Sequence, residues 1–171
     1  MLSGSKISLA TFEREHAQKT LTWLNDTELC KFLGRTEPIS QAEQEIWFEL
    51  LKGKKSETLY FAIETTDTKE HAGNVWLHGI DTKNAKAEVR IVLDPKHSGK
   101  GLGVEALSLI KQYGFEWLNL HKLTGYVLSF NLPAQKAFEK AGYICEAVLT
   151  EERWSNGRYV DLHVFSSIRG R

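Results

Sequence analysis

A strand that leads through a glycine-rich turn directly into a helix is the feature that most constrains this chain. An apolar strand ends at Leu93, the turn contains Gly99, Gly101 and Gly103, and a helical pattern starts at once. Glycine allows positive φ angles and close approach of the backbone to a ligand, and the first turn of a helix has unpaired N–H donors. The segment therefore predicts a site for an anion such as a phosphate.

Length and charge indicate that this site is a local feature. The chain has 171 residues, and we expect one domain spanning residues 1–171. Its 22 Lys and Arg residues balance its 22 Asp and Glu residues, so no overall field attracts it to nucleic acid or to an anionic membrane. Because the sequence shows neither a signal-peptide core nor a run that could span a bilayer, we expect a cytoplasmic protein without a membrane partner.

The two cysteines point to neither a disulfide framework nor a metal site. Two cysteines, Cys30 and Cys145, are too few for a disulfide framework, and their spacing is not that of a metal site. Cysteine most often packs as a small hydrophobe. We therefore expect both thiols to be buried and no metal to be bound.

The first part of the chain predicts a short strand and two helices. The strand should span residues 6–9 and the first helix residues 13–24. Ser40 and Glu43 form a capping box, in which each side chain can bond the other residue's backbone N–H, so the second helix should run from there to Leu51. Its apolar face, packed on a sheet, should consist of Ile46, Trp47, Leu50 and Leu51.

The link between these two helices, residues 27–38, is open to two interpretations. It mixes charged residues with aromatic and apolar ones, so it could line the mouth of a pocket. An ordinary solvated connection is the alternative.

The remaining sequence predicts strands and helices around the glycine turn. Polar turns separate three segments that should be successive antiparallel strands, 59–63, 73–77 and 87–93. A long helix should follow the turn, because apolar residues recur at helical spacing from Leu102 to Trp117. The last elements should be a strand over 122–130, a helix over 131–141 ended by Gly142, and a hairpin around Asn156-Gly157.

The glycine turn does not match two common nucleotide-binding motifs. A P-loop requires GxxxxGK[ST], which residues 99–104 do not supply. A dinucleotide-binding fold needs an acidic residue at the end of the next strand, whereas residues 123–130 end without one. A second motif is needed to interpret the turn.

That second motif begins at Asn131 and ends at Tyr143. It reads NLPAQKAFEKAGY and matches the N-x-x-A-x-x-x-Y/F-E-K-x-G-F/Y helix of the GNAT acyl-CoA N-acetyltransferases, while Gly101 and Gly103 match the family's coenzyme A signature, Q/R-x-x-G-x-G/A. From about residue 7 to residue 165 the chain resembles this family, and its ending over 154–161 is most similar to the RimJ/RimL-type branch. The resemblance implies an α+β fold, with a mixed, mostly antiparallel sheet of about six to seven strands flanked by helices and coenzyme A in a cleft between splayed strands.

The same resemblance implies a binding site for acetyl-CoA. Backbone groups of Ile91, Val92 and Leu93 would bind the pantetheine arm as an added strand binds a sheet edge. Ser98 stands where the family usually has Gln or Arg, and Lys96, His97 or Lys100 could replace the lost donor. The turn would hold the pyrophosphate through Ser98, Gly99, Lys100, Gly101, Leu102 and Gly103. Asn131 would contact the pantetheine arm or the splayed strand beside it, Phe138 would pack under the thioester, and Lys140 would approach the far end of the coenzyme.

The implied reaction is direct transfer of the acetyl group to a neutral primary amine in a ternary complex. Glu88 matches the acidic position that several members use as general base, directly or through water. An ion pair with Arg90 is the alternative role for this carboxylate. A backbone N–H near Val92 would polarise the thioester carbonyl.

The family's usual general acid is absent. Phe138 stands at the position of that tyrosine and cannot donate a proton. If the coenzyme thiol resembles cysteine, with a pKa of about 8.5, its release as a thiolate at pH ~7 costs roughly 2 kcal/mol, which slows the reaction without preventing it. Ser129, Tyr126, Tyr143 or a water molecule could serve instead.

The acceptor is defined least by the sequence. Glu28 and Glu37 could attract a cationic amine, whereas Arg35 could bind a phosphate or carboxylate. We expect a small amine, namely a polyamine, an amino sugar or an aminoglycoside, and a protein N-terminus is the alternative. A coenzyme-binding module without catalysis and a domain used only for interaction are alternatives from other classes, and a homodimer is left open.

Overall fold

The computed structural model of this protein describes residues 2–34, 37–51, 53 and 57–171. Its centre is one mixed sheet of eight strands in the order β1-β2-β3-β4-β5-β6-β8-β7. Every neighbouring pair is antiparallel except β5 and β6, which are parallel. The mostly antiparallel sheet expected from the sequence is thus confirmed, with eight strands where about six to seven were expected; the two-residue strand β1 was not predicted. The strands are β1 Leu2–Ser3, β2 Ile7–Thr11, β3 Thr58–Thr65, β4 His71–Asp81, β5 Lys86–Leu93, β6 Lys122–Leu128, β7 Ile144–Ser155 and β8 Arg158–Ile168.

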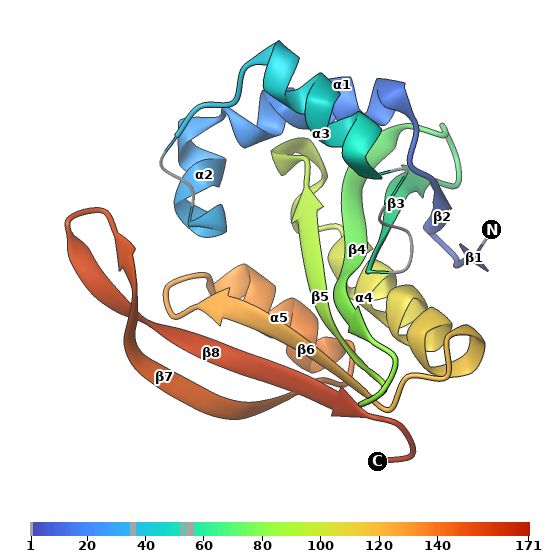
Figure 1. Ribbon diagram of the computed structural model, residues 1–171, viewed down its shortest axis with the longest axis vertical. Helices are drawn as coiled ribbons and strands as arrows, with labels where there is room; N and C mark the ends of the chain where they lie inside the picture. Colours follow the sequence, from blue (N-terminus) through green and yellow to red (C-terminus); the bar gives the residue numbers. More distant parts are fainter. Residues whose placement is uncertain (1, 35–36, 52, 54–56) are drawn as a thin grey trace.

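Five α-helices cover the two faces of the sheet among the described residues. Figure 1 shows α1, α2 and α3 together on one side, and α4 and α5 on the other. None of these helices is long and apolar enough to cross a membrane. The helices are α1 Arg14–Leu24, α2 Thr27–Leu33, α3 Gln41–Leu51, α4 Leu102–Gln112 and α5 Leu132–Lys140, and α4 continues as a π-helical turn, Tyr113–Trp117.

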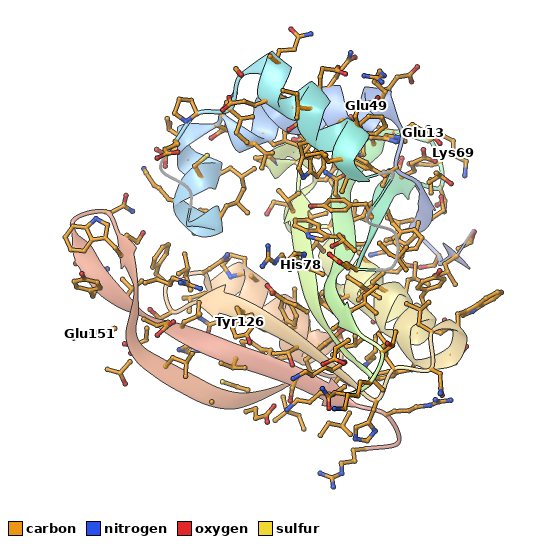
Figure 2. The ribbon with its side chains drawn as sticks, viewed as in Figure 1. Glu13, Glu49, Lys69, His78, Tyr126 and Glu151 are labelled. Atoms are coloured by element: carbon orange, nitrogen blue, oxygen red, sulfur yellow. The ribbon has the colours of Figure 1, made fainter. Side chains whose placement is uncertain are left out.

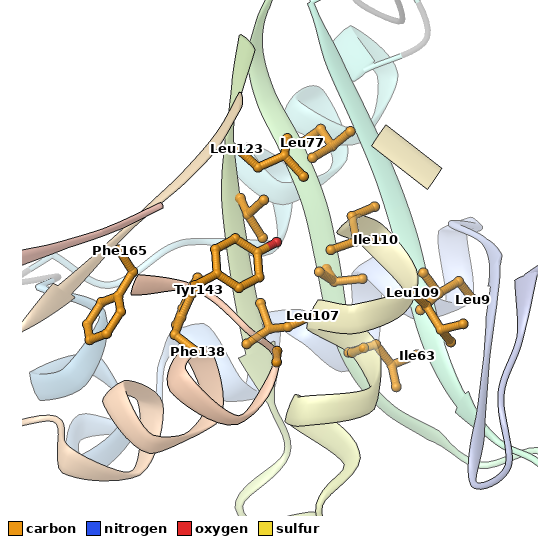
Figure 3. Packing of buried hydrophobic residues seen from close by; sticks show 14 of the residues in the cluster. Leu9, Ile63, Leu77, Leu107, Leu109, Ile110, Leu123, Phe138, Tyr143 and Phe165 are labelled. Atoms are coloured by element: carbon orange, nitrogen blue, oxygen red, sulfur yellow. The ribbon is translucent and has the colours of Figure 1, made fainter. Parts of the chain in front are cut away.

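The main core lies between the sheet and the pair α4 and α5. Leu107 and Ile110 of α4 are completely buried, and Phe138, Tyr143 and Phe165 pack together at one end of the same cluster (Figure 3). A Cβ atom placed on Gly125 of β6 would overlap the ring of Phe138. Because β6 has only a hydrogen atom at this position, α5 lies directly against the strand.

The two parallel strands at the centre of the sheet separate after a short contact. β5 and β6 pair only from Lys86 to Glu88 and from Lys122 to Thr124. Beyond that point β5 continues to Leu93 paired with β4 on one edge only, while β6 turns away with the hairpin formed by β7 and β8 (Figure 1). The splayed strands expected from the sequence are therefore present.

The link over residues 27–38 contains a helix that the sequence did not predict. The side chain of Asp26 accepts hydrogen bonds from the N–H groups of Glu28 and Leu29, at 2.9 and 3.0 Å, and Gly34 ends α2 with a left-handed φ of 65°. No residue of α2 is buried. Leu29, Phe32 and Leu33 have helical spacing, but a single turn of such a pattern is too short to predict a helix by itself.

Two expectations about burial were wrong. Ile46 and Leu50 of α3 are 62% and 56% exposed, because Gln44 and Phe48 are the buried residues of the helix. Trp47 and Leu51 do pack against the core, as expected. Neither cysteine is buried: Cys145 is exposed on the edge strand β7, which is covered on neither face, and Cys30 is half-buried on α2. The amino-acid type alone did not specify which side of each element meets the core.

Candidate active site

A cavity of about 1140 Å³ lies on the side of the sheet that carries α1, α2 and α3, and it reaches into the opening between β5 and β6. Its walls come from sequence segments that are far apart. The lining includes Phe32, Leu33, Glu37 and Trp47 from the α2–α3 region, Tyr60, Asn74, Trp76, Glu88, Arg90 and Val92 from β3 to β5, Tyr126, Leu128, Asn131 and Phe138 from β6 and α5, and Leu149, Glu152, Arg153 and Leu162 from the hairpin.

The register of β4 and β5 determines which backbone groups face the opening. Asn74 is paired with Val92, and the N–H of Asp94 donates to the carbonyl of Ala72 at 2.9 Å. Because backbone groups alternate along an antiparallel ladder, the N–H and C=O of Val92 point to β4. Those of Ile91 and Leu93 point away from β4, toward the space that β6 has left. These groups could bind the amides of an extended ligand.

The glycine turn follows β5 and is built by local capping. Asp94 begins it, since one carboxylate oxygen accepts from the N–H of Lys96 at 3.0 Å. Gly99 and Gly101 have φ angles of 76° and 81°, and Gly101 is the residue before α4. A Cβ on Gly103 would lie 3.2 Å from the side chain of Leu93. The turn therefore uses its glycines both for conformation and for close packing, and its N–H groups could hold a phosphate.

Glu88 and Arg90 form an ion pair beside the cavity. Both lie on β5 and point to the same side, and the two hydrogen bonds between guanidinium and carboxylate measure 2.6 and 3.0 Å. The hydrogen bond to Glu88 raises the pKa of Arg90 above its usual value. Both side chains line the cavity. The structural role considered for Glu88 is thus present, and its position also allows contact with a ligand.

The three side chains considered as general acid are separated by the structure. Tyr126 of β6 is 48% exposed and lines the cavity; Figure 2 labels it near the centre of the molecule. Tyr143 is 2% exposed in the core, and burial raises the pKa of its hydroxyl above the usual range. Neither Tyr143 nor Ser129 is among the described residues that line the cavity. Tyr126 is the one of these three side chains that a ligand there could meet.

The other predicted binding residues are distributed unevenly. Asn131 and Phe138 line the cavity, and the side chain of Asn131 also caps α5 by accepting from the N–H of Ala134 at 3.2 Å. Lys140 lies in the last turn of α5, outside the cavity lining.

The predicted acceptor-binding residues also differ in position. Glu37 lines the cavity, whereas Glu28 lies outside its lining and pairs with Lys31 at 2.5 Å. Arg35 lies outside the described residues.

A buried polar network forms part of the cavity wall, and the sequence analysis missed it. Asn74 donates through Nδ2 to the Thr20 hydroxyl at 2.7 Å, and that hydroxyl donates to the carbonyl of His16. The Asn74 Oδ1 is then left to accept from Nε2 of His71, also at 2.7 Å. His71 therefore carries its proton on Nε2, and burial lowers its pKa to about 4. An asparagine within an otherwise apolar strand was the available sequence signal.

Aromatic rings form a second wall that was not anticipated as a site. Tyr60 and Trp76 stack with ring centroids 4.7 Å apart and 12° between planes, and Trp47 of α3 meets Tyr60 edge-on at 5.2 Å. All three line the cavity. The faces of such rings attract cations.

Comparison with known proteins agrees with this geometry. The profile of the acetyltransferase (GNAT) domain matches residues 6–144. An uncharacterized N-acetyltransferase of Bacillus licheniformis, p20, is 28% identical over 170 residues, which cover 98% of this chain and 96% of that protein. The spermidine N(1)-acetyltransferase of Vibrio cholerae is 35% identical over 102 residues, covering 60% of this chain and 58% of that enzyme.

Solved structures show the same arrangement. The spermidine N-acetyltransferase of Vibrio cholerae in complex with CoA and spermine superposes with a TM-score of 0.89, with 27% identity and 97% of each chain covered. A dodecameric structure of that protein in an intermediate state superposes with a TM-score of 0.80, at 27% identity, covering 97% of this chain and 95% of the other. The splayed strands, the glycine turn and the family profile lead to one conclusion: this chain belongs to the GNAT acetyltransferase family and is an N-acetyltransferase that uses acetyl-CoA.

Proposed function

We propose that this enzyme acetylates a primary amine of a polyamine such as spermidine or spermine. The observation that carries the proposal is the composition of the cavity wall. Among the described residues, four carboxylates line it, from Glu37, Glu43, Glu88 and Glu152, against two guanidinium groups, from Arg90 and Arg153. An excess of carboxylates concentrates a polycation.

The aromatic wall supports the same acceptor class. Trp47, Tyr60 and Trp76 offer ring surface to a flexible aliphatic chain that carries ammonium groups. A cation over such a ring gains about 0.5–1 kcal/mol at an exposed site and about 2 kcal/mol when desolvated. An aminoglycoside or a peptide has more hydrogen-bonding groups to satisfy against these rings, so the wall favours a polyamine. The similarity to spermidine acetyltransferases points to the same class.

Acetyl-CoA supplies the acetyl group as a thioester. We propose that the backbone of Ile91 and Leu93 holds the pantetheine arm and that the turn from Ser98 to Gly103 holds the pyrophosphate. This placement uses the N–H groups that the β4–β5 register leaves directed into the opening. It moves the proposed carbonyl-polarising N–H from Val92 to its neighbour Ile91.

Proton transfer is assigned to two side chains that line the cavity. As the new N–C bond forms, Glu88 would take the proton of the attacking amine. Because Arg90 is hydrogen-bonded to the carboxylate, this proton would pass through a water molecule. As the C–S bond breaks, Tyr126 would give a proton to the leaving sulfur. Each transfer of this kind contributes about 10²–10⁴ in rate.

The acceptor is tested by measuring thiol release from acetyl-CoA with spermidine, spermine, an aminoglycoside, an amino sugar and a peptide with a free N-terminus. We expect the highest kcat/KM for a polyamine. Highest kcat/KM for the peptide would support the RimJ/RimL-type alternative instead. Tight acetyl-CoA binding without turnover of any amine would identify a non-catalytic binding module.

Variants of the cavity carboxylates make the test specific to this wall. Glu37→Gln and Glu152→Gln should each raise the KM for the polyamine about threefold to tenfold and leave the KM for acetyl-CoA unchanged, because each removes one charge from the acceptor side. Glu28→Gln is the matched control, since Glu28 pairs with Lys31 outside the cavity lining. Equal effects of all three substitutions would show that overall surface charge, and not the cavity wall, sets the KM for the polyamine.

A further inference from the structure

Residues 4–6, near the N-terminus, contact the first turn of α4. The carboxylate of Glu105 accepts hydrogen bonds from the N–H groups of Ser5 and Lys6 and from the Ser5 hydroxyl, the last at 3.0 Å. A Cβ atom on Gly4 would overlap this carboxylate, so a larger residue there would displace the Glu105 side chain from its present position. Residues 4–6 are therefore fixed beside the helix that follows the glycine turn.

The side chain of Lys6 extends from this segment onto the turn itself. Its ammonium group donates to the carbonyl oxygen of Lys100 at 3.0 Å. The same nitrogen lies 3.4 Å from the position that a Cβ atom of Gly101 would occupy. Lys6 is thus at the glycine turn although it is 94 positions away from Lys100 in the sequence.

Lys6 holds the part of the turn that otherwise has least support. The start of the turn is fixed by Asp94, through its bond to the N–H of Lys96 and a 3.9 Å ion pair with Lys19. Across residues 98–101, Lys6 donates the only side-chain hydrogen bond to the backbone within the part of the chain that the structure describes. Two of these four residues are glycines with positive φ, whose freedom in solution is large.

The contact determines the direction of one N–H group. In a trans peptide the C=O of one residue and the N–H of the next point to opposite sides. An ammonium bonded to the Lys100 carbonyl therefore holds the N–H of Gly101 pointing away from Lys6. It also polarises that peptide unit, because hydrogen bonds in series strengthen one another.

We propose that Lys6 is a positioning residue for coenzyme A, which acts through the Lys100–Gly101 peptide to direct the Gly101 N–H at the pyrophosphate. The inference rests on the proposed placement of the pyrophosphate at the glycine turn. It assigns to the N-terminal segment a function in cosubstrate binding. It also explains how the turn is held in a chain that has Ser98 in place of a long side chain.

The test is the dissociation constant, measured by calorimetry, of CoA, dephospho-CoA and pantetheine for the wild type and for Lys6→Met, Lys6→Arg and Lys83→Met. We expect Lys6→Met to weaken CoA and dephospho-CoA by the same factor, about tenfold, because a hydrogen bond to a charged group is lost. Pantetheine, which has no pyrophosphate, should bind as before. Lys6→Arg should retain most of the affinity, since a guanidinium can donate to the same carbonyl.

Lys83 is the matched control because it lies in the turn that precedes β5, at the opposite end of the strand from the glycine turn. Unchanged CoA affinity in Lys6→Met would overturn the inference. A loss for CoA but not for dephospho-CoA would also overturn it, by showing direct contact with the 3′-phosphate. So would a loss that includes pantetheine and follows a lower denaturation midpoint, since that outcome indicates a purely structural role.

The placement of the pyrophosphate has its own outcome in the same experiment. If wild-type protein binds pantetheine as tightly as CoA, the phosphates contribute nothing and the proposed placement fails. If the wild type prefers CoA and Lys6→Met keeps that preference in full, the placement stands and the role of Lys6 fails.

Discussion

Glu88 and Arg90 are joined by two hydrogen bonds, of 2.6 and 3.0 Å, on the side of β5 that lines the cavity. A strand places residues i and i+2 on the same side, so this pair follows directly from the sequence spacing. The proposed base is therefore held by a permanent cation. That arrangement keeps the carboxylate in place. A substrate ammonium or a water molecule that binds Glu88 must then compete with Arg90 for the same carboxylate oxygens.

Replacement of Glu88 by Gln should lower kcat about 100-fold or more and leave the affinity for acetyl-CoA unchanged. The amide can still accept a hydrogen bond from Arg90 but cannot take the proton of the amine. Steady-state kinetics with the best amine, together with calorimetry of acetyl-CoA binding, measure both quantities.

Arg90→Met is the companion variant, because it removes the guanidinium and keeps the carboxylate. It should reduce kcat less than Glu88→Gln does. Wild-type turnover in Glu88→Gln would leave Glu88 with only its role in the ion pair.

Tyr126→Phe should lower kcat up to about 30-fold with little change in either KM. Without a proton donor the sulfur leaves as a thiolate, which costs roughly 2 kcal/mol at pH ~7. The loss should become smaller as the pH approaches the pKa of the thiol, because protonation of the leaving group then matters less. A pH series of kcat for both proteins measures this.

Tyr143→Phe provides the comparison. The hydroxyl of Tyr143 is buried without a hydrogen-bond partner among the described residues, so its removal should leave kcat unchanged and should not reduce stability. If Tyr143→Phe slows the reaction and Tyr126→Phe does not, the assignment of the acid is wrong.

His71 should make the protein less stable as the pH falls from about 6.5 to about 4. Burial is the main cause of its lowered pKa of about 4; the charges of His16 and Lys19 add to it and the hydrogen bond to Asn74 opposes it. In the unfolded chain the pKa returns to about 6.5. Between the two values the unfolded state binds the extra proton, so the free energy of unfolding decreases with falling pH by up to about 1.4 kcal/mol per unit, or about 3 kcal/mol in total.

Denaturant unfolding of the wild type and of His71→Gln across this range checks the expectation. Glutamine can donate to Asn74 Oδ1 without titrating, so the variant should lose this part of the pH dependence. Four carboxyl groups have lowered pKa values, those of Glu43, Asp67, Asp81 and Glu146. Their protonation at still lower pH should destabilise both proteins. Parallel curves for the two proteins would show that His71 does not carry the effect.

Much of the fold could be read from local patterns. The capping box of Ser40 and Glu43 is formed, with hydrogen bonds of 2.8 and 3.2 Å, and the Asn156-Gly157 turn has positive φ angles of 49° and 83°. These features depend on a few neighbouring residues, so short-range sequence contains them. The order of strands and helices follows for the same reason.

The opposite holds for features that depend on contacts between distant segments. The sequence could not tell which side of α3 faces inward, because the buried side includes a polar residue, Gln44, whose amide donates to the carbonyl of Ala17 on α1. It could not predict α2, whose helix is held by an end cap and has no buried face.

By itself, therefore, the sequence determined the glycine turn, the Asn131 to Tyr143 helix and with them the family and its cosubstrate. Tertiary structure decided that Tyr126 lines the cavity while Tyr143 does not, that Ile91 and Leu93 present their backbone groups to the opening, and that Lys6 supports the turn. The physical reason is that motifs record local backbone conformation. Burial, strand register and the meeting of residues 6 and 100 arise only when the whole sheet is assembled.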